Sequence, residues 1–139
     1  MRRATPKAAT DKAIIPVESA MGPYDVRLRS DSGSWIAEGI AQLCPGPRIT
    51  VISDTNVVPL HGQRLLDNLR TLGKETQLLQ FDPGEESKTL GTASRLYDHL
   101  LTSGMTRSDA IVGLGGGVVG DVAGFVASTF LRGVGYIQV

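Results

Sequence analysis

The residues from Gly113 to Asp121 have a composition and spacing suited to phosphate binding. They read Gly-Leu-Gly-Gly-Gly-Val-Val-Gly-Asp, between an apolar run on one side and a run with helical character on the other. Three consecutive glycines leave a backbone without side chains, so a phosphate group could approach the main-chain N–H groups directly. The positive end of the following helix dipole would stabilise that anion. The stretch therefore predicts a loop that binds a nucleotide phosphate.

The same stretch contains the spacing of a dinucleotide-binding fingerprint, at Gly115, Gly117 and Gly120. In the usual arrangement the fingerprint follows the first strand, and an acidic residue about 20 positions later binds the ribose. Here at least three strand-like segments precede the glycines, and the sequence stops at Val139 before that acidic position. We therefore expect a phosphate loop in a different topological position. The alternative is a glycine turn with a purely structural role.

Segments with strand and helix patterns alternate around the glycines, which predicts a layered α/β domain with a mainly parallel sheet. Apolar or alternating runs indicate strands at residues 24–28, 48–53, 76–81, 109–114 and 134–139. Helical spacing of apolar residues indicates helices at residues 35–43, 59–72, 93–101 and 118–130. Residues 1–20 show no clear periodicity, and we expect a flexible tail there. Residues 21–139 would then form the α/β domain.

Composition narrows the possible partners and the compartment. The 139 residues contain 14 Lys and Arg against 14 Asp and Glu, without a basic stripe, which argues against nucleic acid as a partner. The single cysteine, Cys44, excludes an internal disulfide and a cysteine-rich zinc site. No apolar run approaches the roughly 20 residues that span a bilayer, and the first residues lack a secretory signal. We expect a cytoplasmic protein that does not contact a membrane.

Three motifs in a fixed order resemble the 3-dehydroquinate synthase family. They are Ser53-Asp-Thr-Asn56, Pro83-Gly-Glu-Glu-Ser-Lys-Thr-Leu90, and the glycine-rich stretch that continues from Gly113 to Val139. Their joint occurrence is far more specific than one glycine loop. The resemblance covers roughly Tyr24 to Val139, essentially the N-terminal nucleotide-binding domain of that family. It implies a Rossmann-like fold, truncated before the C-terminal helical domain that binds the metal.

The resemblance also implies a reaction and its requirements. Members of the family convert 3-deoxy-arabino-heptulosonate 7-phosphate to 3-dehydroquinate and phosphate in the shikimate pathway. They use a bound NAD that is reduced and reoxidised within one turnover, and a divalent metal, zinc or cobalt, held outside the region covered here. A homodimer is the expected assembly, with a small sugar phosphate as substrate. We expect the 139-residue chain to lack a complete catalytic set and a metal site, and therefore to be inactive alone.

By similarity, specific positions would contact the cofactor and the substrate. The residues that would contact NAD are Asp54, Asn56, Gly84, Glu85, Lys88, Gly115, Gly116, Gly117, Val118, Val119, Gly120 and Asp121. Arg132 would bind the substrate phosphate, where a planar guanidinium suits a dianion. Each position also has a local alternative. Asp54 or Asn56 could cap a helix, Glu85 and Lys88 could form a solvated turn, and Asp121 and Arg132 could complement a helix dipole.

Other functions remain open on sequence alone. Other sugar phosphate cyclases share the glycine loop, and metal-dependent alcohol and glycerol dehydrogenases share a looser form of it. A non-catalytic nucleotide-binding module is a further alternative. The two histidines, His61 and His99, lie far apart in the sequence and in no spacing typical of a metal site. We expect both to be surface or partly buried residues.

Overall fold

The computed structural model describes residues 12–20, 22–29 and 34–139. The chain divides into two compact units, Met1–Gly33 and Ser34–Val139. The division falls after Gly33 and not near residue 20, because a strand that the sequence pattern did not predict pairs with the expected strand at residues 24–28. No helix in the described part of the chain is long and apolar enough to cross a membrane.

The described part of the first unit is an antiparallel hairpin of β1 (Lys12–Val17) and β2 (Tyr24–Arg29). Strand β2 alternates between apolar and charged residues, as expected of a strand with two different faces. Strand β1 was missed because its apolar residues run on without alternation and include Pro16. The register gives the hairpin one entirely apolar face, made of Ala13, Ile15, Val17, Tyr24, Val26 and Leu28.

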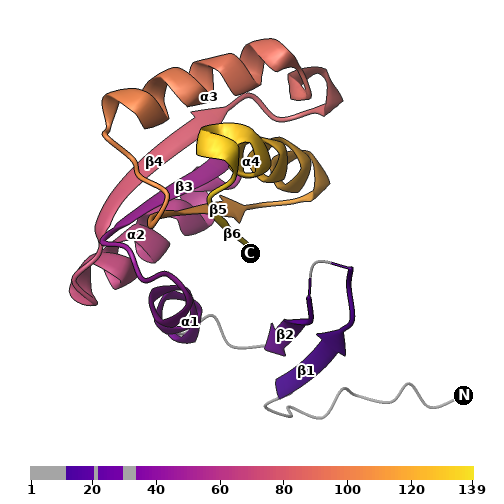
Figure 1. Cartoon of the computed structure of the whole chain (residues 1–139), viewed down its shortest axis with the longest axis vertical. Helices are drawn as coiled ribbons and strands as arrows, with labels where there is room; N and C mark the ends of the chain where they lie inside the picture. Colours follow the sequence, from indigo (N-terminus) through magenta and orange to yellow (C-terminus); the bar gives the residue numbers. More distant parts are fainter. Residues whose placement is uncertain (1–11, 21, 30–33) are drawn as a thin grey trace, which may run out of the picture. The chain divides into compact units, whose positions relative to one another are not determined.

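In the second unit, the described strands form one four-stranded parallel sheet in the order β4-β3-β5-β6 (Figure 1). The strands are β3 (Arg48–Asp54), β4 (Glu75–Phe81), β5 (Ala110–Leu114) and β6 (Gly135–Gln138). All four agree with the strands expected from sequence. The central strands are the most apolar: every residue of β5 and five of the seven residues of β3 are buried. Continuous apolar runs of this kind are typical of parallel strands covered on both faces.

Helices cover both faces of this sheet. α1 and α2 pack on one face, whereas α3 and α4 pack on the other (Figure 1). The helices are α1 (Trp35–Leu43), α2 (Gln63–Thr71), α3 (Leu90–Thr102) and α4 (Gly117–Thr129), with short 3-10 turns η2 (Glu85–Ser87) and η3 (Phe130–Arg132). A π-helical turn, η1 (Val58–Gly62), precedes α2 where the sequence predicts an α-helix from Pro59. Fold class and element order therefore match the α/β prediction.

The chain changes direction in the sheet between β3 and β5. After β3 it passes through α2 on one face to β4 at one edge, and after β5 it passes through α4 on the other face to β6 at the opposite edge. The two connections leave neighbouring strands in opposite directions, so β3 and β5 form a topological switch point at their carboxyl ends. Ligands of open α/β sheets bind at such a switch point.

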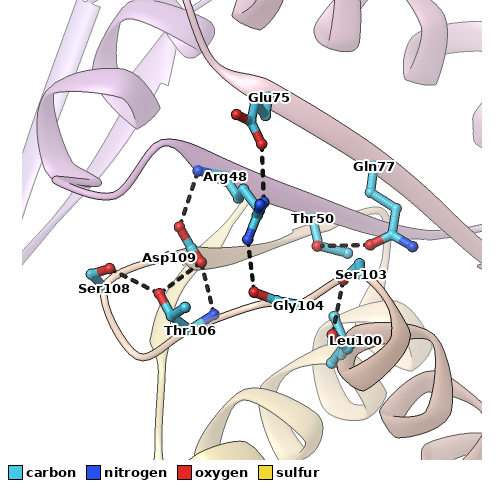
Figure 2. A network of polar contacts seen from close by, with 10 residues as sticks. All are labelled: Arg48, Thr50, Glu75, Gln77, Leu100, Ser103, Gly104, Thr106, Ser108 and Asp109. Carbon is cyan, nitrogen blue, oxygen red and sulfur yellow. Dashed lines mark hydrogen bonds and ion pairs between the residues drawn. The ribbon is translucent and has the colours of Figure 1, made fainter.

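A polar network around Asp109 connects the strands at their amino ends, away from the switch point (Figure 2). One carboxylate oxygen of this buried residue accepts a 3.1 Å hydrogen bond from the backbone N–H of Arg48. The other accepts hydrogen bonds from the backbone N–H and the hydroxyl of Thr106, at 2.8 and 2.9 Å. The Arg48 side chain reaches Glu75 on β4 and the carbonyl of Gly104. These contacts connect the first residue of β3 to β4 and to the loop that precedes β5.

Candidate nucleotide-binding site

The glycine bend connects β5 to α4 over three residues. Leu114 ends the strand, Gly115 has a φ of 154°, Gly116 caps the helix and Gly117 begins it. A Cβ added to Gly115 would lie 2.8 Å from a methyl group of Val119, a separation that real Cβ atoms do not show. Gly115 is therefore required by the tight turn itself.

The next two glycines have no such packing requirement. A Cβ added to Gly116 or Gly117 would meet no atom within 4 Å, and both residues are exposed. The first N–H groups of α4 have no partner within the helix, as at any helix N-terminus. The bend is thus an open surface of main-chain donors. Since nothing packs there, a pyrophosphate could rest against it, and the structure meets this steric requirement of dinucleotide binding.

Hydrogen bonds from both neighbouring strands hold the bend. The backbone N–H of Gly115 donates to the carbonyl of Val139 at 3.0 Å, and the N–H of Val139 donates to the carbonyl of Gly113 at 2.8 Å. On the other side, the buried Ser53 hydroxyl donates to the carbonyl of Leu114 at 2.6 Å. The sequence did not assign a role to Ser53. Its position at the end of a buried strand, where a polar side chain needs a partner, is the signal that could have revealed it.

Asp54 is the last residue of β3 and Asn56 follows it, at the same carboxyl end of the sheet as the bend. One oxygen of Asp54 accepts hydrogen bonds from the backbone N–H groups of Asn56 and Val57, at 2.8 and 2.9 Å. Asp54 therefore shapes the turn after β3, but it does not cap the following helical turn, whose N-cap is Val57 and which has no side-chain cap. Asn56 is exposed. Because β3 and β5 are neighbours in the sheet, these residues and the glycine bend lie at the same switch point.

Lys88 connects the segment after β4 to the N-terminal part of α4. Its ammonium lies 2.8 Å from a carboxylate oxygen of Asp121 and 2.8 Å from one of Glu85. The hydrogen bonds to Asp121 and then to Glu85 raise the pKa of Lys88, so the side chain stays protonated well into the alkaline range. Gly84, just before this turn, has a φ of 110°, a conformation that favours glycine.

A groove of about 230 Å³ opens beside this ion-pair cluster, between the start of α3 and α4. Lys88 and Asp121 form its polar side, and Leu90 and Phe125 contribute its exposed apolar side. The structure thus brings together residues from two motifs that are more than thirty positions apart in the sequence. The turn at Glu85 and Lys88 is part of a contact between two elements of the fold and is not only a solvated loop.

Arg132 lies away from the residues described above. It follows the C-terminal end of α4, whereas the glycine bend precedes the N-terminal end, and a 13-residue helix is about 20 Å long. The backbone at Leu131 and Arg132 has φ values of 49° and 67°, which are unusual for residues other than glycine. The side chain of Arg132 is exposed and makes no ion pair with another described residue.

The residues present do not fit a metal site. Among the described residues, no three His, Cys, Asp or Glu side chains are grouped so that they could hold a metal ion. His61 lies in the π-helical turn and His99 in α3. Cys44 is buried, and this burial raises the pKa of its thiol, which Lys74 nearby lowers only in part.

Sequence comparison relates the chain to 3-dehydroquinate synthases. Residues 78–139 match the family model for the N-terminal domain of 3-dehydroquinate synthase. The chain is 42% identical over 117 residues to a 3-dehydroquinate synthase of Streptococcus sanguinis, an alignment that covers 84% of this chain and 33% of the relative. It is 40% identical over 125 residues to the enzyme of that name from Streptococcus agalactiae, covering 90% and 35%. The chain therefore spans about one third of the length of these relatives.

Solved structures of sugar phosphate cyclases resemble the fold. One is 2-deoxy-scyllo-inosose synthase complexed with carbaglucose-6-phosphate, NAD+ and Co2+, with a TM-score of 0.76 and 27% identity over 91% of this chain and 35% of that one. Another is the 2-epi-5-epi-valiolone synthase of Streptomyces hygroscopicus with NAD+ and Zn2+ bound, with a TM-score of 0.60 and 28% identity over 66% and 26% of the two chains.

Proposed function

Because this chain is related in sequence to the N-terminal third of 3-dehydroquinate synthases, we propose that it provides the NAD-binding part of such an enzyme. The proposed reaction is the conversion of 3-deoxy-arabino-heptulosonate 7-phosphate to 3-dehydroquinate and phosphate. The observation that carries the proposal is the open main chain at Gly116 and Gly117, at the switch point between β3 and β5. The NAD+ bound in two related sugar phosphate cyclases of known structure supports it.

In this proposal different groups of the chain bind different parts of the cofactor. The N–H groups that begin α4 bind the pyrophosphate, where the helix dipole favours negative charge. Glu85 accepts hydrogen bonds from ribose hydroxyls on the adenosine side, and Lys88 holds that carboxylate in place at 2.8 Å. Asp121, which pairs with the same ammonium at 2.8 Å, contacts the cofactor from α4. NAD, when bound, supplies a hydride acceptor that later returns the hydride.

An alanine at Gly117 tests this directly. Its methyl group would enter empty space in the folded chain, so the melting temperature should not fall, but it would occupy the position proposed for the pyrophosphate. We expect titration calorimetry to show at least tenfold weaker NAD binding for Gly117→Ala than for the wild-type chain. The matched control is Gly91→Ala, also exposed in the first turn of a helix and without a close neighbour. Equal NAD affinity in wild type and Gly117→Ala would refute the proposed site.

A second candidate function is a different sugar phosphate cyclase, which the likeness to 2-deoxy-scyllo-inosose synthase favours. The two candidates share the cofactor and differ in the sugar phosphate. The NAD-loaded chain can be titrated with the heptulosonate phosphate and, separately, with carbaglucose-6-phosphate. We expect preference for the heptulosonate phosphate, and stronger binding of the carbaglucose compound would favour the second candidate.

A further inference from the structure

We propose that the side chain of Gln138 contacts the nicotinamide half of the bound dinucleotide and contributes to the choice of NAD over shorter adenine nucleotides. This inference rests on the proposed function. Gln138 is the last residue of β6 and pairs with Gly113 of β5, so it lies at the same carboxyl edge as the glycine bend. Its side chain is exposed at this edge.

The carboxamide of Gln138 lies directly against the first turn of α4. A Cβ placed on Gly120 would lie 2.7 Å from its Nε2, 3.1 Å from its Cδ and 3.3 Å from its Oε1. The carboxamide therefore occupies the space that any other residue at position 120 would fill. This close approach gives Gly120, the third glycine of the fingerprint, a specific purpose: it lets the glutamine reach the N-terminal end of the helix.

The neighbouring polar residue on this face has a different role. The hydroxyl of Tyr136 donates a 3.1 Å hydrogen bond to the carbonyl of Gly120, and the ring lies against Gly113 and Gly124. Its polar group is thus used to pack α4 on the sheet. The carboxamide of Gln138 makes no hydrogen bond to any side chain or backbone group among the described residues, although it offers two donors and one acceptor. It is therefore available to a ligand.

The N-terminal part of α4 has a polar side chain on each flank. Asp121 contacts Lys88, which follows the edge strand β4, whereas Gly120 contacts Gln138 on the opposite edge strand β6. A dinucleotide with its pyrophosphate on the bend extends one nucleoside toward each side. Because the adenosine half is proposed to lie toward Glu85 and Lys88, the nicotinamide half extends toward β6. A neutral carboxamide suits that place, since it can bond a ribose hydroxyl or the nicotinamide amide without repelling the diphosphate.

Binding of a ligand series separates recognition from packing. Wild type, Gln138→Met and Tyr136→Phe would be titrated with ADP, ADP-ribose and NAD, with melting temperatures recorded for each variant. Methionine keeps the length of the side chain but not its hydrogen bonds. Loss of one hydrogen bond, about 0.5–1.5 kcal/mol, predicts NAD binding weakened about three- to tenfold in Gln138→Met. ADP binding should be unchanged, because ADP lacks the nicotinamide half.

Tyr136→Phe is the control for a purely structural effect. It removes a bond that positions α4 and is expected to change the affinities for all three ligands by the same factor. An equal loss for ADP and NAD in Gln138→Met, or no loss for either, would overturn the role of Gln138 while leaving the proposed cofactor site intact. If the wild-type chain binds neither ADP nor NAD, the proposed function is overturned as well.

Discussion

The hydroxyl of Ser53 donates a 2.6 Å hydrogen bond to the carbonyl of Leu114. These residues are register partners in β3 and β5, the two strands between which the direction of the chain reverses. Leu114 is also the last residue before the glycine bend. A single buried side-chain hydrogen bond therefore fixes the start of the bend to the strand that leads to Asp54 and Asn56.

Replacing Ser53 by alanine should reduce stability, because the Leu114 carbonyl loses its buried donor. We expect the free energy of unfolding to fall by about 1–2 kcal/mol in denaturant titration. Ser128→Ala is the matched control, since Ser128 also donates to a backbone carbonyl, that of Phe125, but on the exposed side of α4. That variant should lie within about 0.5 kcal/mol of wild type. Equal effects of the two substitutions would contradict a special role for the Ser53 bond.

The consecutive glycines should respond differently to alanine. Gly115→Ala would clash with Val119 and would place an L-residue at a φ of 154°, so we expect a loss of about 1–3 kcal/mol in the free energy of unfolding. Gly116→Ala has open space and a φ of −82°, and it should be nearly neutral for stability. Thermal unfolding of both variants checks the contrast. Similar melting temperatures would show that the turn at Gly115 is not as tight as described.

Local pattern predicted most of the second unit because its elements obey simple rules. Each element was indicated by its pattern of apolar residues, such as the buried runs of β3 and β5 and the leucines of α2. Prolines and glycines indicated the approximate limits of the elements. Strand β1 was not predicted because its residues show no alternation and its partner is defined by tertiary pairing. The π-helical form of the turn at Pro59 likewise depends on packing and not on local propensity.

The candidate site was predictable only where the residue types of a short, continuous segment indicate its chemistry. The glycine bend followed from residue type, but nothing local indicates that Lys88 bonds Asp121, 33 positions later. The resemblance suggested both residues without showing their contact. The hydrogen bonds by which Asp54 holds the turn after β3 also require coordinates. Contacts of Ser53 and Gln138 with residues of distant elements could not be deduced from spacing, since they arise from strand register.

Asp109 should make the stability of the chain sensitive to acid. Burial alone raises the pKa of this carboxyl, but hydrogen bonds from the backbone of Thr106 and Arg48 and from the Thr106 hydroxyl outweigh it and hold the pKa below its ordinary value of 3.8 (Figure 2). A carboxyl whose pKa is lowered by folding stabilises the folded state above its ordinary pKa. That contribution is lost as the pH falls through the lowered value.

The variant Asp109→Asn tests this pH dependence. At neutral pH it exchanges charge-assisted hydrogen bonds for a mismatched amide, and we expect a loss of about 2–3 kcal/mol in the free energy of unfolding. The difference from wild type should shrink as the pH falls below 3.8, because the carboxyl of the unfolded wild-type chain then binds a proton and that of the folded chain binds one only at lower pH. Denaturant titrations of both proteins at several pH values measure this difference in the free energy of unfolding. A difference that stays constant from neutral pH to pH 3 would contradict a lowered pKa at Asp109.

Arg132 is held in a backbone conformation that costs an ordinary residue free energy. Its φ of 67° follows a φ of 49° at Leu131, and the left-handed region costs a residue with a side chain about 1–2 kcal/mol. Arg132→Gly should therefore raise the free energy of unfolding by about 1 kcal/mol, because the exposed side chain makes no ion pair with another described residue. Arg132→Lys keeps the strain and should leave stability unchanged.

The neighbouring glycine provides the opposite test. Gly133 has a φ of 109°, so Gly133→Ala should destabilise the chain where Arg132→Gly stabilises it. If both arginine variants have wild-type melting temperatures, the conformation at Arg132 is not strained. If Arg132→Gly alone is more stable, the arginine is retained against a cost to folding, as expected for a side chain with a binding role. That outcome would support a contact of Arg132 with the substrate phosphate. Weaker binding of the heptulosonate phosphate by Arg132→Gly would measure this contact directly.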